Sequence, residues 1–208
     1  MALVEDYDFH VIMPCDVTLP LNYAERMLEE FEKYPNLVMA SGDWGSKKTV
    51  APHGGGRFVR QSFFWNYYQD GYVHKMGYES EILDKALSEG FNIKVLNDLE
   101  FYHHEELGHG HGFKTWGESM KTMGYLPIFA YGRFIMDFFT NKEVGKMGAI
   151  KMWWYYTTFK PHKTGYYSMW PNDVVESVRR RQRKETKRYI RRFVYKLAVM
   201  ALRKVHKK

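Results

Sequence analysis

The sequence predicts an α/β fold, because apolar runs typical of strands alternate with segments of helical periodicity. Residues 9–13 form a short run rich in β-forming side chains, and Pro14 ends it by removing a backbone donor. Apolar side chains then recur at helical spacing from Asn22 onward, and Asn22 with Glu25 matches a helix-capping pattern. A second apolar run follows at 37–40. Strand, helix and strand in this order indicate a layered α/β domain whose first strand is buried.

The rest of the chain continues this alternation and ends in a basic segment. Five glycines between residues 41 and 56 predict a loop, of the kind that often carries function. Alternating apolar and polar residues at 91–95 predict a further strand. The last segment places its apolar residues on one side of a basic helix of about 30 residues. The predicted helices cover residues 61–68, 80–89, 113–123, 127–139 and the segment from 174 onward.

Composition narrows the cellular setting. Of the 208 residues, 45% are hydrophobic and 17% aromatic, which excludes a disordered chain. The single cysteine, Cys15, excludes an internal disulfide and suits a reducing compartment. The start of the chain has no signal-like pattern, and no apolar run approaches the ~18 residues of a spanning helix. We therefore expect a cytoplasmic protein that is not integral to a membrane.

Charge divides the chain unevenly. Residues 174–208 hold 14 Lys and Arg against 2 Asp and Glu, whereas residues 1–173 hold 17 against 22. A basic amphipathic helix lies readily on anionic lipid, so we predict peripheral attachment to the inner face of the membrane. The alternative is a solvated helix that packs back on the acidic body, and nucleic acid is not expected because no recognised binding fold accompanies the charge. The expected membrane-binding residues are Arg180, Arg183, Lys187, Arg191 and Lys196.

Asp16 and a pair of histidines are candidate metal ligands. Asp16 follows the first predicted strand, and the carboxyl ends of strands in open α/β sheets are where ligands bind. Its carboxylate could hold Mg²⁺ or Mn²⁺ against a diphosphate, or could simply cap the next helix. His103 and His104 follow a predicted strand, so they point to opposite faces and only one can face the site. His109 and His111 are flanked by glycines and fit loop residues better than ligands.

Two carboxylates and a glycine-rich segment complete the candidate chemistry. Glu79 and Glu81 lie at the start of a predicted helix, where the dipole favours carboxylates, and either could act as a general base toward an acceptor hydroxyl. Glycines allow close approach to a ligand, and arginine binds phosphate through paired hydrogen bonds. The alternative is that the arginines are ordinary surface residues, since the glycines match neither the P-loop nor the dinucleotide pattern. The expected donor- and acceptor-binding residues are Gly55, Gly56, Arg57 and Arg60.

In this order the segments resemble the inverting glycosyltransferases of family 2, which have the GT-A fold, and archaeal or archaeal-virus members in particular. The resemblance covers residues 7–131. Residues 14–23 match an Asp-x-Asp-Val turn that is closed by Leu-Pro and an Asn-Tyr helix start. The other matching motifs are Gly77-Tyr78-Glu79 before a helix that ends at Gly90, and the strand end at His103, His104 and Gly108.

The resemblance implies a metal-dependent enzyme that moves a sugar from a nucleotide-sugar donor to a hydroxyl of a glycan or lipid-linked acceptor. It implies a GT-A-like mixed sheet flanked by helices. Asp16 takes the place of the metal-binding aspartate, with His103 or His104 as a further ligand of Mn²⁺ or Mg²⁺. Glu79 takes the place of the base. We expect a catalytic domain over residues 1–142 and an aromatic and basic extension over residues 143–208.

Two departures from the family pattern change what the chain is expected to do. Pro14 stands where the family has the first aspartate of the pair. Only thirteen residues precede Pro14, whereas the family has there the strands that hold the nucleotide, so the expected fold is truncated at its N-terminus. Three explanations stay open: a separate protein that supplies the nucleotide-binding half, a shortened enzyme, or an inactive remnant that acts as a peripheral membrane adaptor. A metal-binding protein based on the nine histidines has little support without a fixed ligand spacing.

Overall fold

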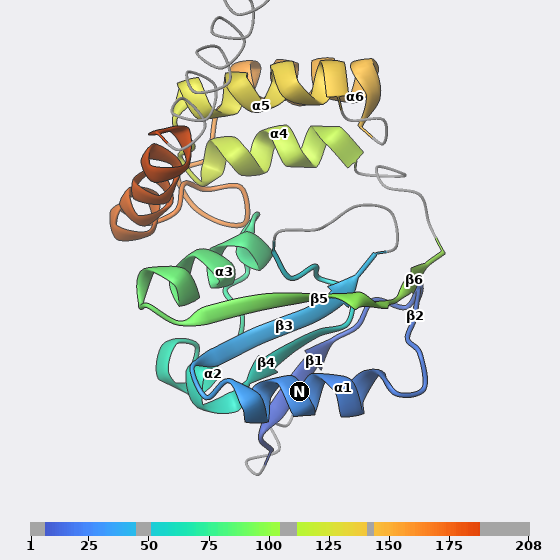
Figure 1. The fold of residues 1–208 in the computed structure, drawn as a ribbon. Coiled ribbons are helices and arrows are strands. Elements are labelled where there is room, and N and C mark those ends of the chain that lie inside the picture. Colours follow the sequence, from blue (N-terminus) through green and yellow to red (C-terminus); the bar gives the residue numbers. More distant parts are fainter. Residues whose placement is uncertain (1–6, 45–50, 105–111, 141–143, 188–208) are drawn as a thin grey trace, which may run out of the picture. The chain divides into compact units, whose positions relative to one another are not determined.

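The structure is a computed structural model that describes residues 7–44, 51–104, 112–140 and 144–187. Contacts between residues separate the chain into two compact units, Met1–Gly112 and Phe113–Lys208. Both are drawn in Figure 1, and each is treated by itself. The boundary between the units thus lies after Gly112, ahead of the boundary predicted at residue 142. That a catalytic domain covers residues 1–142 stays a prediction.

The first unit is built on a mixed sheet of four strands. In sheet order these are β1 (Phe9–Ile12), β4 (Arg57–Arg60), β3 (Leu37–Asp43) and β5 (Asn92–Glu100). Because β4 is antiparallel to β1 and β3, and β3 is parallel to β5, the strands β1, β3 and β5 share one direction. Their carboxyl ends and the start of β4 therefore meet at one edge of the sheet (Figure 1). Beyond that edge, β2 (Val17–Thr18) pairs antiparallel with β6 (Tyr102–His103).

Helices cover both faces of this sheet. On one face, Tyr23, Met27 and Phe31 of α1 (Tyr23–Lys33) pack against the strands. The other face is covered by Phe63 and Phe64 of α2 (Gln61–Tyr67) and by α3 (Tyr78–Ser88), which share a second buried cluster with β3 and β4. Figure 1 shows α1 and α3 on opposite sides of the sheet. The predicted α/β class, the mixed sheet and the flanking helices are confirmed.

Two local predictions in the first unit are wrong. The strand at 9–12 is not buried: β1 is an edge strand of the sheet with β4 as its neighbour, and Val11 is 42% exposed. The side chain of Asn22 makes no capping hydrogen bond, and the backbone of Tyr23 instead donates to the carbonyl of Pro20. A turn closed by a main-chain hydrogen bond thus replaces the expected cap.

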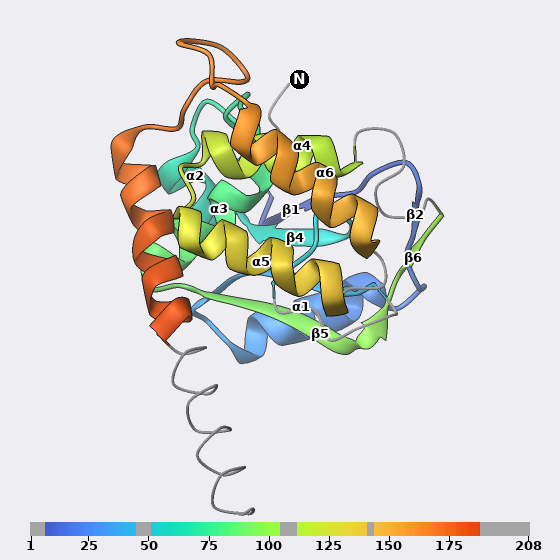
Figure 2. The same ribbon diagram turned by 90° about the horizontal axis from the view of Figure 1, so that it is seen from above.

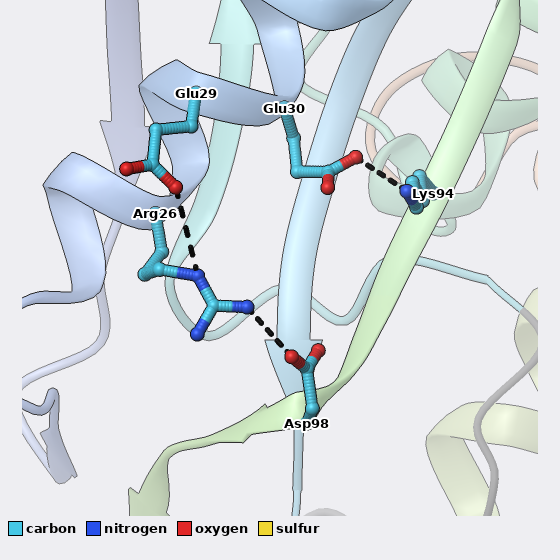
Figure 3. A network of polar contacts seen from close by, with 5 residues as sticks. All are labelled: Arg26, Glu29, Glu30, Lys94 and Asp98. Carbon is cyan, nitrogen blue, oxygen red and sulfur yellow. Dashed lines mark hydrogen bonds and ion pairs between the residues drawn. The ribbon is translucent and has the colours of Figure 1, made fainter.

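Charged side chains on α1 face β5 (Figure 3). Nη2 of Arg26 lies 2.6 Å from Oδ2 of Asp98, and Lys94 pairs with Glu30. The hydrogen bond from Arg26 lowers the pKa of Asp98. Because the Asp98 side chain is 71% exposed, water screens the attraction between Arg26 and Asp98. The pair therefore helps to align α1 along β5 more than it stabilises the fold.

The second unit is helical. Its helices α4 (Gly112–Thr122), α5 (Pro127–Thr140) and α6 (Gly145–Thr158) are followed by a helical segment at 172–187. Figure 2 shows α5 and α6 side by side, and the two helices pack on each other. The helices predicted at 113–123 and 127–139 are confirmed.

The basic C-terminal helix packs against its own unit over its described part. Val175 and Val178 are buried, and Oε1 of Gln182 accepts a hydrogen bond from the backbone N–H of Leu126 at 2.8 Å. Nε of Arg179 donates to the carbonyl of Gly124 at 2.8 Å. The apolar side expected to meet lipid is thus used in packing up to residue 187. Arg180, Arg183 and Lys187 are exposed, whereas Arg191 and Lys196 lie outside the described residues.

Gly117 sets how closely α4 and α6 approach. A Cβ atom added at Gly117 would lie 2.5 Å from the carbonyl oxygen of Met152, whereas one added at Gly132 in α5 meets nothing within 4 Å. We predict that Gly117→Ala lowers the free energy of unfolding by about 2 kcal/mol, because a backbone atom has to move. Gly132→Ala is the matched control and should raise it by about 0.5–1 kcal/mol. Urea denaturation measures both, and equal effects would contradict the close crossing.

His10 makes the stability of the first unit depend on pH. Its Nε2 lies 2.7 Å from the hydroxyl of Tyr72, and burial lowers the pKa of His10 from 6.5 to about 4. Since the unfolded chain binds this proton at higher pH, stability is fully present above pH 6.5 and declines as the pH falls toward about 4. We predict that His10→Leu flattens the decline measured by urea denaturation across that range. An unchanged slope would show that His10 is not the group that titrates.

Candidate functional site

The edge where β1, β3 and β5 end brings Asp16 and His103 together. The pairing of β2 with β6 sets Val17 opposite His103, and the carbonyl of Asp16 accepts a hydrogen bond from the backbone N–H of His104 at 2.8 Å. In this register, Oδ2 of Asp16 lies 3.4 Å from Nε2 of His103. Both side chains are partly exposed, at 24% and 18%. Two groups that are 87 positions apart in the sequence therefore form one polar contact.

His104 takes a different partner from its neighbour. Its Nε2 lies 2.8 Å from Oγ1 of Thr18, its ring contacts Tyr102 edge to face, and the residue is exposed. The divergence of the two histidines agrees with alternation along a strand. His103 is therefore the better candidate for a ligand beside Asp16, and the metal role of both histidines stays a prediction.

Trp44 and His53 belong to the same site, although no local pattern in the sequence points to either. Trp44 follows β3, and its ring centroid lies 5.3 Å from that of His103 and 5.1 Å from that of His53. His53 precedes β4, and the two imidazole centroids are 6.3 Å apart. The aromatic ring of Trp44 thus contacts both imidazoles and forms an apolar wall beside the Asp16 contact.

His53 is set up as a neutral imidazole. Its Nδ1 lies 3.3 Å from the backbone N–H of Gly55 and accepts from it, which assigns the ring proton to Nε2. Burial lowers the pKa of His53, and the nearby charges of Arg57 and His103 lower it further, against an opposing effect of Glu79. His53 is therefore a hydrogen-bond donor through Nε2 at neutral pH.

The two candidate bases lie in different surroundings. Glu79 is exposed, its carboxylate lies directly over Gly54, and Oε1 accepts a hydrogen bond from the hydroxyl of Tyr78 at 3.3 Å. Glu81 is 6% exposed, and its Oε2 accepts a hydrogen bond from the hydroxyl of Tyr68 at 2.7 Å. Burial raises the pKa of Tyr68, and the Glu81 carboxylate raises it further. Glu79 is therefore the more accessible of the two carboxylates, and the role of either as a base stays a prediction.

The two arginines predicted to bind a ligand are used by the fold. Arg57 is 2% exposed and donates to the carbonyls of Pro52, His53 and Glu79, so it ties the segment before β4 to the start of α3. Arg60 donates to main-chain carbonyls of α1 and β3, and its guanidinium lies over the rings of Phe9 and Phe31. Both guanidiniums thus have partners within the protein, and the ligand-binding role of these arginines stays a prediction.

The glycines before β4 also serve packing. A Cβ atom at Gly54 would lie 2.8 Å from Oε2 of Glu79, and one at Gly55 would lie 3.1 Å from the ring of Phe101. Gly56 has a φ of +68°, and its carbonyl accepts a hydrogen bond from the hydroxyl of Tyr23. Side chains of the protein therefore lie close to Gly55 and Gly56, and the role of these glycines in ligand binding stays a prediction.

A divalent metal fits the site only in part. Asp16 and His103 supply one oxygen and one nitrogen donor, which Mn²⁺ accepts. Across the described ranges, no group of three or more His, Cys, Asp and Glu side chains could hold a metal ion. The remaining ligands would have to come from the substrate or water. The candidates Gly108, His109 and His111 lie outside the described residues.

Comparisons with known proteins give no family assignment. No family model matches the chain, and no curated protein matches it. In the part of the chain that the structure describes, none of the helices has the length and apolar character needed to cross a membrane. The function is therefore argued from the geometry of the site.

The carboxylates of Glu81 and Glu79 differ in their surroundings, because Glu81 is buried and bonded to Tyr68 whereas Glu79 is exposed. We predict that Tyr68→Phe lowers the free energy of unfolding by about 1–3 kcal/mol, because the buried carboxylate of Glu81 loses a donor. Glu79→Gln should change it by less than about 0.5 kcal/mol, since that side chain is exposed. Urea denaturation of the two variants gives the comparison. Similar losses in both would mean that Glu79 is also part of the packing.

Proposed function

We propose that this chain is the catalytic part of an inverting glycosyltransferase that takes its sugar from a nucleotide-sugar donor. The observation that carries the proposal is the convergence of Asp16, His103 and the Gly54–Glu79 contact at the carboxyl edge of one sheet. Ligands bind at this edge in open α/β sheets. The order of the motifs along the sequence, which resembles family 2, supports the same reading.

Glu79 is the proposed general base. It is exposed at the first turn of α3 and lies against Gly54, which has no side chain to cover it. Its carboxylate takes the proton of an acceptor hydroxyl while that oxygen attacks the anomeric carbon. The bond from the anomeric carbon to the diphosphate breaks as the new glycosidic bond forms, and the configuration inverts. Trp44 and His53 flank the site, where an apolar wall and an Nε2 donor would orient a sugar.

Asp16 and His103 are the residues that would hold Mn²⁺ or Mg²⁺. The metal would stabilise the negative charge that develops on the departing diphosphate. Asp16 supplies a hard oxygen ligand and His103 a nitrogen ligand, and the two already lie 3.4 Å apart. Arg57 at the start of β4 is bound to main-chain carbonyls, so a bound cation would supply positive charge that this guanidinium does not offer to a ligand.

A second candidate is a half-enzyme or an inactive remnant that works as an adaptor. Two observations favour it: the metal ligands are incomplete among the described residues, and β1 pairs on one side only in the described sheet. An open edge strand can accept a strand from another chain. A separate protein that supplies the nucleotide-binding half would add its strands beside β1.

Donor binding and turnover test the proposal. We predict that the full chain binds a nucleotide sugar in calorimetry only when Mn²⁺ is present, and that Asp16→Asn weakens this binding at least about tenfold. Glu79→Gln should spare binding and lower turnover by about 100-fold or more. Asp70→Asn and Glu32→Gln, both at exposed positions, are the matched controls.

Each failure has its own meaning. Absence of Mn²⁺-dependent binding heat would overturn an enzyme that is active alone and leave the partner-dependent enzyme and the adaptor. Normal turnover in Glu79→Gln would refute the base. Restoration of turnover by a second protein, and not by metal alone, would identify the split enzyme.

A further inference from the structure

The outer surface of α5 and α6 is strongly apolar. On α5, Ile128, Ile135 and Phe139 are 69%, 61% and 75% exposed, and they recur at spacings of seven and four residues. On α6, Met147 and Trp154 are 66% and 55% exposed, one above the other at a spacing of seven. Side chains at these spacings share one face of a helix. Each helix therefore has an exposed apolar stripe.

These stripes are additional to the core of the unit. The inner sides of the same helices already bury Ala130 and Phe134 from α5, and Ala149, Met152 and Tyr156 from α6. A helix that packs on one side only is expected to be polar on the other. Exposed apolar surface beyond the need of the fold marks an interaction site.

A hollow between the two helices interrupts this face. It has a volume of about 350 Å³ and is lined by aromatic and aliphatic side chains, among them Tyr131, Phe138, Ile150 and Trp153. No charged residue lines it. An apolar chain could enter such a hollow, whereas a sugar or a phosphate would find no partner there.

The charge of the unit indicates which partner covers the face. Residues 113–208 hold 22 Lys and Arg against 6 Asp and Glu, a net charge of +16. In the described part, Glu118, Asp137, Glu176 and Glu185 each lie within 4.0 Å of a basic side chain, so much of the positive charge is left without an acidic neighbour. Two copies with this charge repel each other, while an anionic surface attracts them.

The composition of the face also suits the surface of a bilayer. Trp153 and Trp154 stand next to each other on α6, and tryptophan is enriched at the level of the lipid headgroups. Lys146 and Lys151 are exposed on the same helix, where long side chains can reach headgroups while neighbouring apolar residues insert. Each helix has 14 residues, or about 21 Å, which is too short to cross the ~30 Å of a bilayer core.

We propose that the apolar face of α5 and α6 is a membrane-binding surface that inserts into the interface of an anionic lipid bilayer. The apolar stripes enter the boundary between headgroups and acyl chains, and the basic residues of the unit meet the phosphates. The site differs from the basic side of the C-terminal helix, which up to residue 187 could offer a membrane only its charges because Val175 and Val178 are buried in the unit. Lipid binding by this face does not require glycosyl transfer.

Vesicle binding tests this surface with the full chain. We predict that the protein cosediments with vesicles of phosphatidylglycerol and phosphatidylcholine, and that brominated acyl chains quench its tryptophan emission. Phe139→Gln combined with Trp154→Gln should weaken binding at least about tenfold, because two apolar groups no longer leave water. Both residues are exposed, so the variant keeps its fold. Leu21→Gln in the first unit, where Leu21 is fully exposed, is the matched control and should bind like the wild type.

Three outcomes would overturn the proposal. Equal vesicle affinity of the double variant and the wild type would exclude the face as the contact. If the protein bound vesicles but brominated acyl chains did not quench its tryptophan emission, the attachment would rest on charge alone. A dimer that is seen in light scattering and disappears in the double variant, with no vesicle binding by the wild type, would give the face to a second copy of the chain.

Discussion

The hydroxyl group of Tyr23 joins the three segments that form the candidate site. It accepts a hydrogen bond from the backbone N–H of Gly42 at 2.7 Å and donates to the carbonyl of Gly56 at 2.8 Å. Gly42 lies near the end of β3, and Gly56 precedes β4, so one side chain of α1 fixes the spacing of both at the sheet edge. Burial raises the pKa of Tyr23 to about 12, which keeps the hydroxyl protonated and able to donate. The placement of Trp44 and His53 depends on this bridge.

The contact also explains why glycine recurs at this edge. A Cβ atom at Gly42 would lie 2.2 Å from the carbonyl oxygen of Leu99, and one at Gly56 would meet the hydroxyl of Tyr23 at 2.7 Å. Close backbone approach is the usual reason for glycine beside a phosphate, but here the approaching groups belong to the protein. Arg57 likewise contacts the protein and not a ligand, because its guanidinium donates to main-chain carbonyls. The base of the site is therefore filled by contacts within the protein, whereas Glu79 is exposed and Asp16 is partly exposed.

Local periodicity was sufficient for most helices and for the strands β1, β3 and β5, but it predicted neither β4 nor the order of the strands in the sheet. The helix at 113–123 and the one at 127–139 follow from spacing alone, whereas the exposure of β1 depends on which strands become its neighbours. Glu79 and Glu81 are two residues apart and read alike in the sequence, and only the burial of one face of α3 against Tyr68 separates them. His53 could not be found at all, because its neighbours Trp44 and His103 come from the ends of other strands. Asp16 and His103 could be singled out because each comes shortly after a strand, β1 or β5, that ends at the same edge.

In the helical unit, the sequence does not predict which apolar residues of α5 are buried and which are exposed. Apolar residues lie all round α5, and such a pattern is compatible with a buried helix or with one that meets lipid. The structure separates the two sets, since Ala130 and Phe134 are buried while Ile135 and Phe139 are exposed. An exposed apolar face on a unit of charge +16 is stable in water only if it stays apart from other copies or is covered by a surface of opposite charge. An anionic lipid surface would cover the apolar face and carry the opposite charge. It would also hold a lipid-linked acceptor of the kind that the proposed transfer reaction uses.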